Sequence, residues 1–214
     1  MTSLRKSSNL RLAIVLLAAG EGSRMGSVPK VLLQKDGKTL LERFCTAVKS
    51  LDPVEFLVVT GFHAMPVERE LNKLAKLMDL PITIVHNSNA STGQASSVRL
   101  ALESLNIAFD VVAMCLSDQP YIGEDELITL LNQFVDREPN QEVVMPMVGG
   151  QRGNPVLFSK KVVEEMLQIP GMVCRSFMEK NPNRIKIFDC HHDAYILDVD
   201  TEADIQNLGI TRTQ

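Results

Sequence analysis

A loop rich in glycine and positive charge follows the first apolar run of the chain. Residues 17–30 read LAAGEGSRMGSVPK and hold three glycines, one arginine and one lysine. Glycines let several backbone N–H groups converge on one anion, and concave arrangements of such groups bind phosphate. Arg24 and Lys30 would add charge-assisted hydrogen bonds. The spacing fits neither the dinucleotide-binding nor the Walker pattern, so we expect another kind of phosphate site, with a plain surface loop as the alternative.

Carboxylates suited to a metal ion stand at the ends of two apolar runs. Asp118 ends the run DVVAMCLSD, and Asp198 and Asp200 lie two residues apart near the C-terminus. Mg²⁺ prefers one or two carboxylates together with phosphate oxygens and water, so Asp118 is suited to hold Mg²⁺ against phosphates. On a strand, Asp198 and Asp200 would face the same side. Local roles are the alternative, because these residues could also serve a turn before proline and the start of a helix.

Small polar residues crowd the stretch 87–97, between a predicted strand and a predicted helix. They include Asn87, Gly93 and Ser97. Amide groups can read the edge of a base through paired donors and acceptors, and a helix start offers free N–H groups to an anion. A loop that only caps the helix would use the same residue types. The stretch is therefore a candidate for contact with a nucleotide.

The elements that must position these residues alternate between strand and helix. Apolar or β-branched runs predict strands over 12–18, 55–61, 81–87, 110–118, 142–148, 155–158, 184–190 and 194–200. Helical spacing predicts helices over 39–51, 67–78, 93–105, 123–135, 159–168 and 174–180, with a last helix from Thr201. This alternation predicts a Rossmann-like, three-layer α/β fold with a mostly parallel mixed sheet. We expect a disordered tail over 1–10, one domain over 11–210, and ligands at the carboxyl edge of the sheet.

Composition narrows the classes of partner. The 214 residues carry a formal net charge of -4, whereas nucleic-acid-binding faces are normally basic, so we expect no nucleic-acid partner. The four cysteines are scattered without a C-x-x-C pair, which favours a reducing, cytoplasmic location. The basic start and the first apolar run imitate a signal peptide, but the glycine loop that follows favours a buried strand. No apolar run approaches the roughly 20 residues that span a bilayer, so we expect no membrane partner.

Five segments together resemble one family. LAAGEGSRMGSVPK resembles the loop with which nucleotidyltransferases wrap a nucleoside triphosphate, and it is most similar to that of the molybdenum cofactor cytidylyltransferase family, which is MobA-like. The further segments are IVHNSNASTGQASSVRLA (84–101), LSDQP (116–120), RGNPVLF (152–158) and ILDVDTEAD (196–204). These matches run from about residue 12 to 205 in the family's order.

The resemblance implies a function and a set of site residues. It implies a Mg²⁺-dependent transfer of CMP from CTP to molybdopterin, with release of pyrophosphate, and it implies a molybdenum enzyme as the client. The implied catalytic residues are Arg24, Lys30, Asp118 and Asp200, with Asp118 and Asp200 as metal ligands. The implied nucleotide contacts are Leu17, Ala18, Ala19, Gly20, Gly22, Ser23, Asn87, Gly93 and Ser97. The implied acceptor contacts are Arg152, Gly153, Asn154 and Arg175.

The departures from the family pattern lie on the acceptor side. Asn154 stands where many relatives have histidine, and PGMVCR (170–175) lacks the usual Gly-Asp-x-Gly form before the arginine. Other functions therefore stay open: a sugar- or polyol-phosphate nucleotidyltransferase, a molybdopterin guanylyltransferase, or a non-catalytic module that binds a nucleotide or cofactor for molybdenum enzymes. The form LAAG favours cytidine, since guanylyltransferases tend to carry LAGG.

Overall fold

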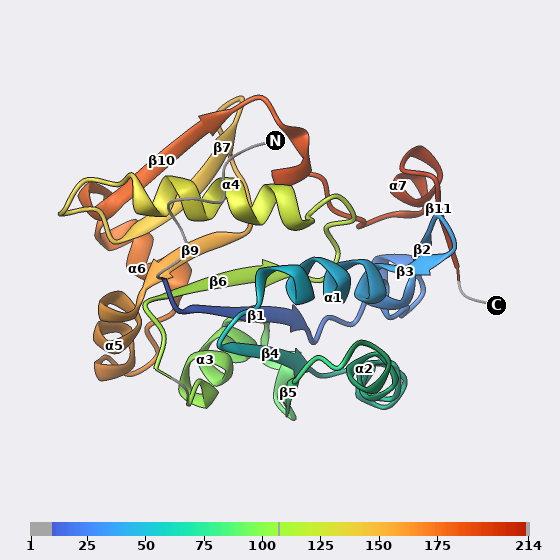
Figure 1. The fold of residues 1–214 in the computed structure, drawn as a ribbon. Coiled ribbons are helices and arrows are strands. Elements are labelled where there is room, and N and C mark those ends of the chain that lie inside the picture. The colour runs from blue at the N-terminus through green and yellow to red at the C-terminus, as the bar shows by residue number, and fades with distance from the viewer. Residues whose placement is uncertain (1–9, 107, 213–214) are drawn as a thin grey trace.

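The core of the fold is a mixed sheet in which most strands run parallel (Figure 1). The computed structural model describes residues 10–106 and 108–212, so the predicted tail, apart from Leu10, lies outside the described residues. The strand order is β10-β7-β9-β6-β1-β4-β5, and β9 runs antiparallel to both neighbours. The bounds are β1 Leu12–Ala18, β4 Glu55–Thr60, β5 Thr83–His86, β6 Val111–Leu116, β7 Val143–Val148, β8 Gln151–Arg152, β9 Val156–Ser159 and β10 Ile185–Cys190. The predicted fold class is confirmed.

β1 lies in the interior of the sheet, and its sequence is apolar without interruption. All seven of its residues, LAIVLLA, are buried. The strand pairs in parallel with β4 on one side and β6 on the other. Since a strand covered on both faces has no polar side, it needs no polar alternation. The carboxyl ends of these three strands therefore lie side by side, and the loops that follow them meet at one edge.

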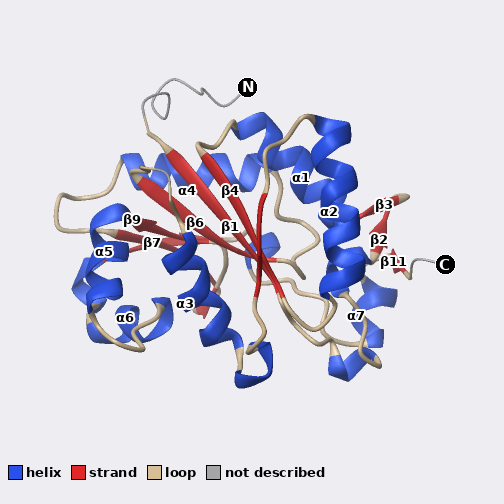
Figure 2. Cartoon of the chain, turned by 90° about the horizontal axis from the view of Figure 1, so that it is seen from below, coloured by secondary structure: helices blue, strands red, loops and turns tan. Residues whose placement is uncertain are grey.

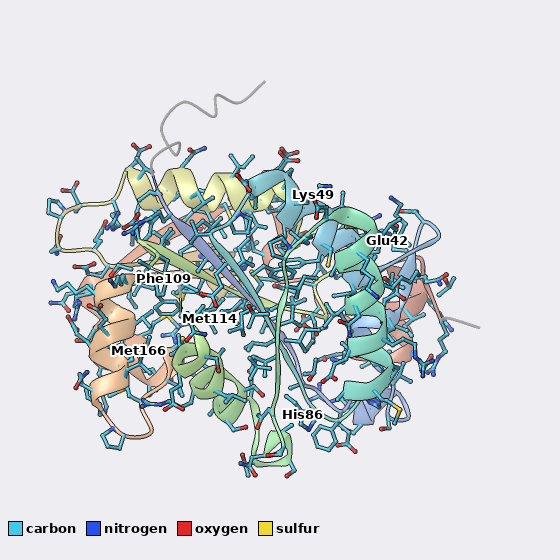
Figure 3. All side chains as sticks on the ribbon, turned by 60° about the horizontal axis from the view of Figure 1, so that its bottom comes forward. Glu42, Lys49, His86, Phe109, Met114 and Met166 are labelled. Carbon is cyan, nitrogen blue, oxygen red and sulfur yellow. The ribbon has the colours of Figure 1, made fainter. Side chains whose placement is uncertain are left out.

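Helices cover both faces of the sheet (Figure 2). Helices α1, α2 and α4 pack on one face, and α3, α5 and α6 pack on the other. Their bounds are α1 Leu40–Leu51, α2 Ala64–Met78, α3 Gln94–Ser104, α4 Glu124–Val135, α5 Lys160–Gln168, α6 Cys174–Lys180 and α7 Glu202–Asn207. Phe109, Met114 and Met166 fill the layer on the α3 and α5 side (Figure 3). Among the described residues, no helix is both long and apolar enough to cross a membrane.

A small second sheet lies beside the carboxyl edge, and the sequence did not predict it. It consists of β2 Gln34–Lys35, β3 Lys38–Thr39 and β11 Ile210–Thr211, in the order β11-β2-β3. A separate apolar cluster joins this region to the glycine loop and to the C-terminal segment, and it includes Met25, Leu33, Val199 and Ile205. This cluster therefore holds the loop with Arg24 and Lys30 against the segment with Asp200.

The strand predicted over 194–200 is wrong. The structure has a short 3-10 helix at Asp193–Tyr195, followed by irregular backbone. The backbone N–H of Val199 donates to the carbonyl of Asp118, 2.9 Å away, so this segment pairs with a turn and not with a strand. Most other predicted elements are confirmed with ends shifted by a few residues, the largest shift being that α2 begins at Ala64 and not at 67.

Candidate functional site

A cavity of about 470 Å³ opens at the carboxyl edge, between the ends of β1, β4 and β6. Most of the residues that sequence reasoning selected line it. They are Leu17, Ala18, Ala19, Gly20, Gly22, Ser23, Arg24, Lys30, Gly93, Ser97, Asp118 and Asp200. The cavity has a charged end and an end with few charges, as expected of a site for a ligand that has both an ionic and a neutral part.

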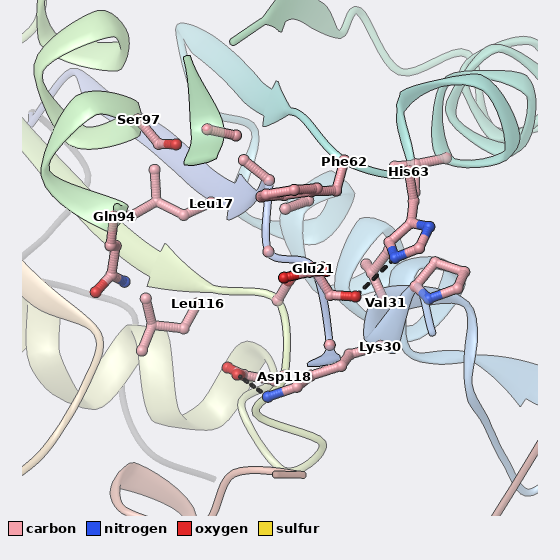
Figure 4. Close-up of a pocket in the computed structure, with 18 of the residues that line it drawn as sticks. Leu17, Glu21, Lys30, Val31, Phe62, His63, Gln94, Ser97, Leu116 and Asp118 are labelled. Carbon is pink, nitrogen blue, oxygen red and sulfur yellow. Dashed lines mark hydrogen bonds and ion pairs between the residues drawn. The ribbon is translucent and has the colours of Figure 1, made fainter. Parts of the chain in front are cut away.

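The charged end is an ion-pair network centred on Lys30 (Figure 4). The Nζ atom of Lys30 lies 3.1 Å from Oδ2 of Asp118 and 2.5 Å from Oδ1 of Asp200. Nη1 of Arg24 lies 2.8 Å from Oδ2 of Asp200, although the Arg24 side chain is 72% exposed. Partial burial by itself would lower the pKa of Lys30, but the charges and hydrogen bonds of Asp118 and Asp200 outweigh it, and the pKa is raised. Lys30 is therefore a charged residue at neutral pH.

The glycine loop has a conformation that side chains would prevent. Gly22 has a φ of +66°, and a Cβ atom there would lie 2.2 Å from the carbonyl oxygen of Val28. The carbonyl of Gly22 accepts hydrogen bonds from the backbone N–H groups of Met25 and Ser27. The loop is thus a tight turn between β1 and the 3-10 helix Lys30–Leu32. This turn brings Arg24 to the same carboxylate that Lys30 contacts.

The acidic residues of the cavity fit Mg²⁺ that arrives with a phosphate ligand. Asp118 and Asp200 reach one and the same nitrogen atom, so their oxygens are near enough to share a small cation. Asp198 also lines the cavity, and partial desolvation together with the charges of Asp118 and Asp200 raises its pKa. The described residues contain no ready cluster of three or more His, Cys, Asp or Glu ligands. Mg²⁺ needs only one or two carboxylates when phosphate oxygens and water complete its shell, so this donor set is suitable.

The less charged end is lined by residues that sequence reasoning partly missed. Phe62 and His63 follow β4, and Gln94 and Leu116 lie across the cavity from them (Figure 4). Phe62 is 46% exposed, which is unusual for an aromatic residue, and it lines the cavity. Nε2 of His63 lies 2.8 Å from the carbonyl oxygen of Glu21. The rule that loops after parallel strands form the site could have found both residues, because they directly follow Gly61 at the end of β4.

Three segments of the chain come close together at Gly61. A Cβ atom on Gly61 would lie 2.7 Å from the carbonyl oxygen of Ala19 and 2.8 Å from the Cβ atom of Ala90. Ala19 and Ala90 both line the cavity. Larger side chains at these positions would push the ends of β1 and β4 apart, so this wall of the cavity is fixed by small residues.

Asn87 shapes the neighbouring loop and is not among the residues that line the cavity. Its side chain is buried, and Nδ2 donates to the hydroxyl oxygens of Ser96 and Ser97, each 2.9 Å away. Its Oδ1 accepts from the backbone N–H of Asn89 at 2.9 Å. Both polar groups of this amide therefore have partners within the protein. A direct contact of Asn87 with a nucleotide stays a prediction.

The predicted acceptor residues lie outside the cavity lining. Arg152 is exposed on β8, whereas Gly153 is buried and the backbone N–H of Asn154 donates to the carbonyl of Tyr195, 2.8 Å away. Arg175 is 84% exposed and pairs with Glu179 of its own helix. Binding of an acceptor by these residues therefore stays a prediction that the cavity alone does not test.

Comparison with known proteins decides the family. Residues 14–185 match the family described as the MobA-like NTP transferase domain. The chain belongs to this family. The matched range includes the glycine loop, Lys30 and Asp118, while Asp198 and Asp200 lie beyond its end. The predicted resemblance to MobA-like nucleotidyltransferases is thereby confirmed, and the narrower assignment to molybdenum cofactor cytidylyltransferases stays a prediction.

Two curated proteins are similar to the chain over part of their own length. The bifunctional protein GlmU of Francisella philomiragia is 38% identical over 128 residues, which is 59% of this chain and 26% of GlmU. The GlmU of Bifidobacterium adolescentis is 29% identical over 209 residues, or 94% of this chain and 43% of that protein. The chain thus spans less than half the length of these curated relatives.

Solved structures share the fold of this MobA-like domain. Rv0371c from Mycobacterium tuberculosis H37Rv superposes with a TM-score of 0.71 and 23% identity, covering 92% of this chain and 97% of that one. The 4-diphosphocytidyl-2C-methyl-D-erythritol synthase from Anaerococcus prevotii gives a TM-score of 0.68 and 17% identity, covering 92% and 93%. The sheet and its helical layers are therefore those of nucleotidyltransferase structures.

Proposed function

We propose that this MobA-like NTP transferase domain catalyses nucleotidyl transfer. An acceptor phosphate attacks the α-phosphorus of a nucleoside triphosphate in line, the bond from the α-phosphorus to the bridging oxygen breaks, and pyrophosphate leaves. The observation that carries the proposal is the pairing of Asp118 and Asp200 with Lys30 and Arg24 at one end of a single cavity. Phosphoryl-transfer sites of this kind act by positioning and by charge neutralisation, without a covalent nucleophile.

The basic residues would bind the phosphates, and the acidic residues would bind the metal ion. Arg24, Lys30 and the N–H groups of the glycine loop would hold the β- and γ-phosphates and the charge that develops on the leaving pyrophosphate. Asp118 and Asp200 would hold Mg²⁺, which supplies positive charge to the α-phosphate and to the attacking oxygen. The Rv0371c protein, which shares the fold, has also been solved in complex with manganese, which supports a divalent ion in this architecture.

The less charged end would receive the nucleoside, and we propose CTP as the donor. The proposal rests on Ala19 within LAAG, the form that goes with cytidine in the family resemblance, and Ala19 lines the cavity. The ring of Phe62 would stack on the base, because aromatic faces pair well in offset geometry. The A. prevotii neighbour is by name a diphosphocytidyl synthase, and another neighbour was solved with CTP.

The acceptor that we propose is molybdopterin, giving its cytosine dinucleotide for a molybdenum enzyme. This part rests on the resemblance of RGNPVLF and of the segment before Arg175 to the family, and Arg152, Gly153, Asn154 and Arg175 would form the acceptor side. Asn154 in place of the usual histidine leaves a sugar or polyol phosphate as the second candidate.

Pyrophosphate release separates these functions. The purified chain with Mg²⁺ and each of CTP, GTP, ATP and UTP is assayed with molybdopterin and, in parallel, with sugar and polyol phosphates. We expect release with CTP and molybdopterin. Release only with a sugar phosphate would show that molybdopterin is not the acceptor, and release only with GTP would show that CTP is not the donor. Tight nucleotide binding without release from any pair would indicate a binding module instead.

A further inference from the structure

The carbonyl oxygen of Tyr195 joins three segments near the acidic pair. Nε2 of Gln119 donates to it at 3.0 Å, in a buried contact. The backbone N–H of Asn154 donates to the same oxygen at 2.8 Å. The turn with Asp118 and Gln119, the RGNP turn (152–155) and the segment 195–200 therefore meet at a single atom, although they are far apart in the sequence.

A second hydrogen bond makes the contact between turn and segment rigid. The backbone N–H of Val199 donates to the carbonyl of Asp118 at 2.9 Å. Two consecutive residues of the turn, Asp118 and Gln119, thus bind two positions of the segment that leads into Asp200. The register between the Asp118 and Asp200 carboxylates depends on both bonds, since no strand pairing exists at this point of the described fold.

The side-chain oxygen of Gln119 is in an unfavourable environment. The residue is 7% exposed, and its Oε1 atom is buried without a hydrogen-bond partner in the protein. A buried acceptor without a partner is destabilising, so an apolar residue of the same size would suit a purely structural role better. The amide orientation is fixed because Tyr195 offers a carbonyl, which only the NH₂ group can serve.

Gly153 shows how tightly the junction is packed. A Cβ atom at this position would lie 2.8 Å from the carbonyl oxygen of Tyr195 and 2.9 Å from its Cβ atom. Its φ does not require glycine, so the requirement comes from the approach of Tyr195 alone. The RGNP turn therefore packs closely against the same Tyr195 carbonyl to which Gln119 donates a hydrogen bond.

We propose that Gln119 is a positioning residue that sets the spacing of the Asp118 and Asp200 carboxylates through the Tyr195 carbonyl, and that it links this spacing to the acceptor-side turn. The inference deepens the proposed function and rests on it. Without the Gln119 bond the segment 195–200 keeps its fold through the Val199 contact and the apolar cluster, but the two carboxylates lose their fixed separation. The expected defect lies in metal binding and turnover, and not in nucleotide binding.

The test compares Gln119→Met with Tyr195→Phe. Gln119→Met keeps the volume and removes the donor. Tyr195→Phe removes the hydroxyl bond to the carbonyl of Glu126 but leaves the Tyr195 backbone carbonyl in place, so it is the matched control. Mn²⁺ affinity in the presence of CTP is measured by electron paramagnetic resonance. CTP binding without metal, pyrophosphate release and melting temperature are measured beside it.

We expect Gln119→Met to weaken Mn²⁺ binding to the CTP complex by about tenfold or more, as is typical when a partner behind the ligands is lost. Its kcat should fall while CTP binding and KM at saturating Mg²⁺ stay close to wild type. Gly153→Ala, which displaces the same carbonyl, should act in the same direction and serves if Gln119→Met fails to fold. Wild-type Mn²⁺ affinity and kcat in folded Gln119→Met, or an equal loss in Tyr195→Phe, would overturn the inference. Absence of CTP and Mn²⁺ binding in the wild type would instead overturn the proposed function.

Discussion

Asp118 and Asp200 share one partner, because the ammonium group of Lys30 donates a hydrogen bond to each of them. Arg24 adds a second bond to Asp200. In this arrangement the cations that we propose for the phosphates neutralise the carboxylates that we propose for the metal ion. A triphosphate and a divalent ion that bind together can replace both sets of partners at once, whereas either alone must break ion pairs without full compensation.

Replacing Lys30 by Met should therefore strengthen metal binding in the absence of nucleotide. The variant removes a positive charge within 3.1 Å of both carboxylates, so Mn²⁺ affinity should rise by about tenfold or more, given interaction energies of about 1–4 kcal/mol for charges near a surface. Triphosphate binding should weaken in the same protein. Lys73→Met removes an equal charge from a pair with Glu70 on α2 and is the control. Unchanged or weaker Mn²⁺ binding in Lys30→Met would contradict the shared-partner account.

Replacing Asp118 by Asn keeps the volume and removes the charge. Turnover should fall by about two orders of magnitude or more, because metal and charge contacts supply several kcal/mol of transition-state stabilisation. Asp200→Asn should behave similarly. The start of α7 should survive this change, since Asp204 Oδ2 accepts from the backbone N–H of Asp200 and not from its side chain. Steady-state kinetics and melting temperature are measured together, and near-wild-type turnover of Asp118→Asn at low Mg²⁺ would refute the role.

The donor preference can be tested by binding alone. CTP with Mg²⁺ should raise the melting temperature more than GTP, since the LAAG form of the loop, with Ala19 in the cavity lining, favours cytidine and guanine is larger. A thermal-shift panel of four nucleoside triphosphates measures this directly. An equal or larger shift with GTP would transfer the assignment to guanylyl transfer.

The pair of Arg11 and Asp110 predicts a pH-dependent part of the stability. The side chain and backbone of Arg11 donate to Asp110 and lower the pKa of that carboxyl from 3.8 to about 2. A carboxyl whose pKa is lower in the folded state stabilises the fold above its unfolded pKa and loses this effect as pH falls toward the folded value. Asp110→Asn should therefore melt below wild type at neutral pH, and the gap should close between about pH 4 and pH 2. A gap that stays constant down to pH 2 would contradict this.

Local patterns in the sequence were sufficient for the scaffold and for one half of the site. The unbroken apolar run of β1 and the position of Asp118 after β6 placed the glycine loop and this carboxylate at the same edge. The segment 194–200 was wrongly predicted as a strand. Its alternating apolar residues pack in apolar clusters, and its backbone bonds to the turn at Asp118, so neither needs a neighbouring strand. Local sequence carries no signal for such a partner.

The contact of Lys30 with the acidic pair is a similar case. From residue types alone, we predicted that the cations bind phosphate and that the carboxylates bind metal. The ion pairs between them were not predicted, because they depend on the long-range packing of Met25 and Leu33 with Val199 in one apolar cluster. Phe62 and His63 were missed for another reason, since an aromatic residue after a strand is more often core than site.

A crystal structure of the chain with CTP and Mn²⁺, with the ion located by anomalous scattering, tests the central claim most directly. The account predicts one manganese ion in contact with both Asp118 and Asp200 and with the α-phosphate, the β- and γ-phosphates on Arg24, Lys30 and the glycine loop, and the base against Phe62. A triphosphate bound outside this cavity, or an ion distant from both carboxylates, would contradict it.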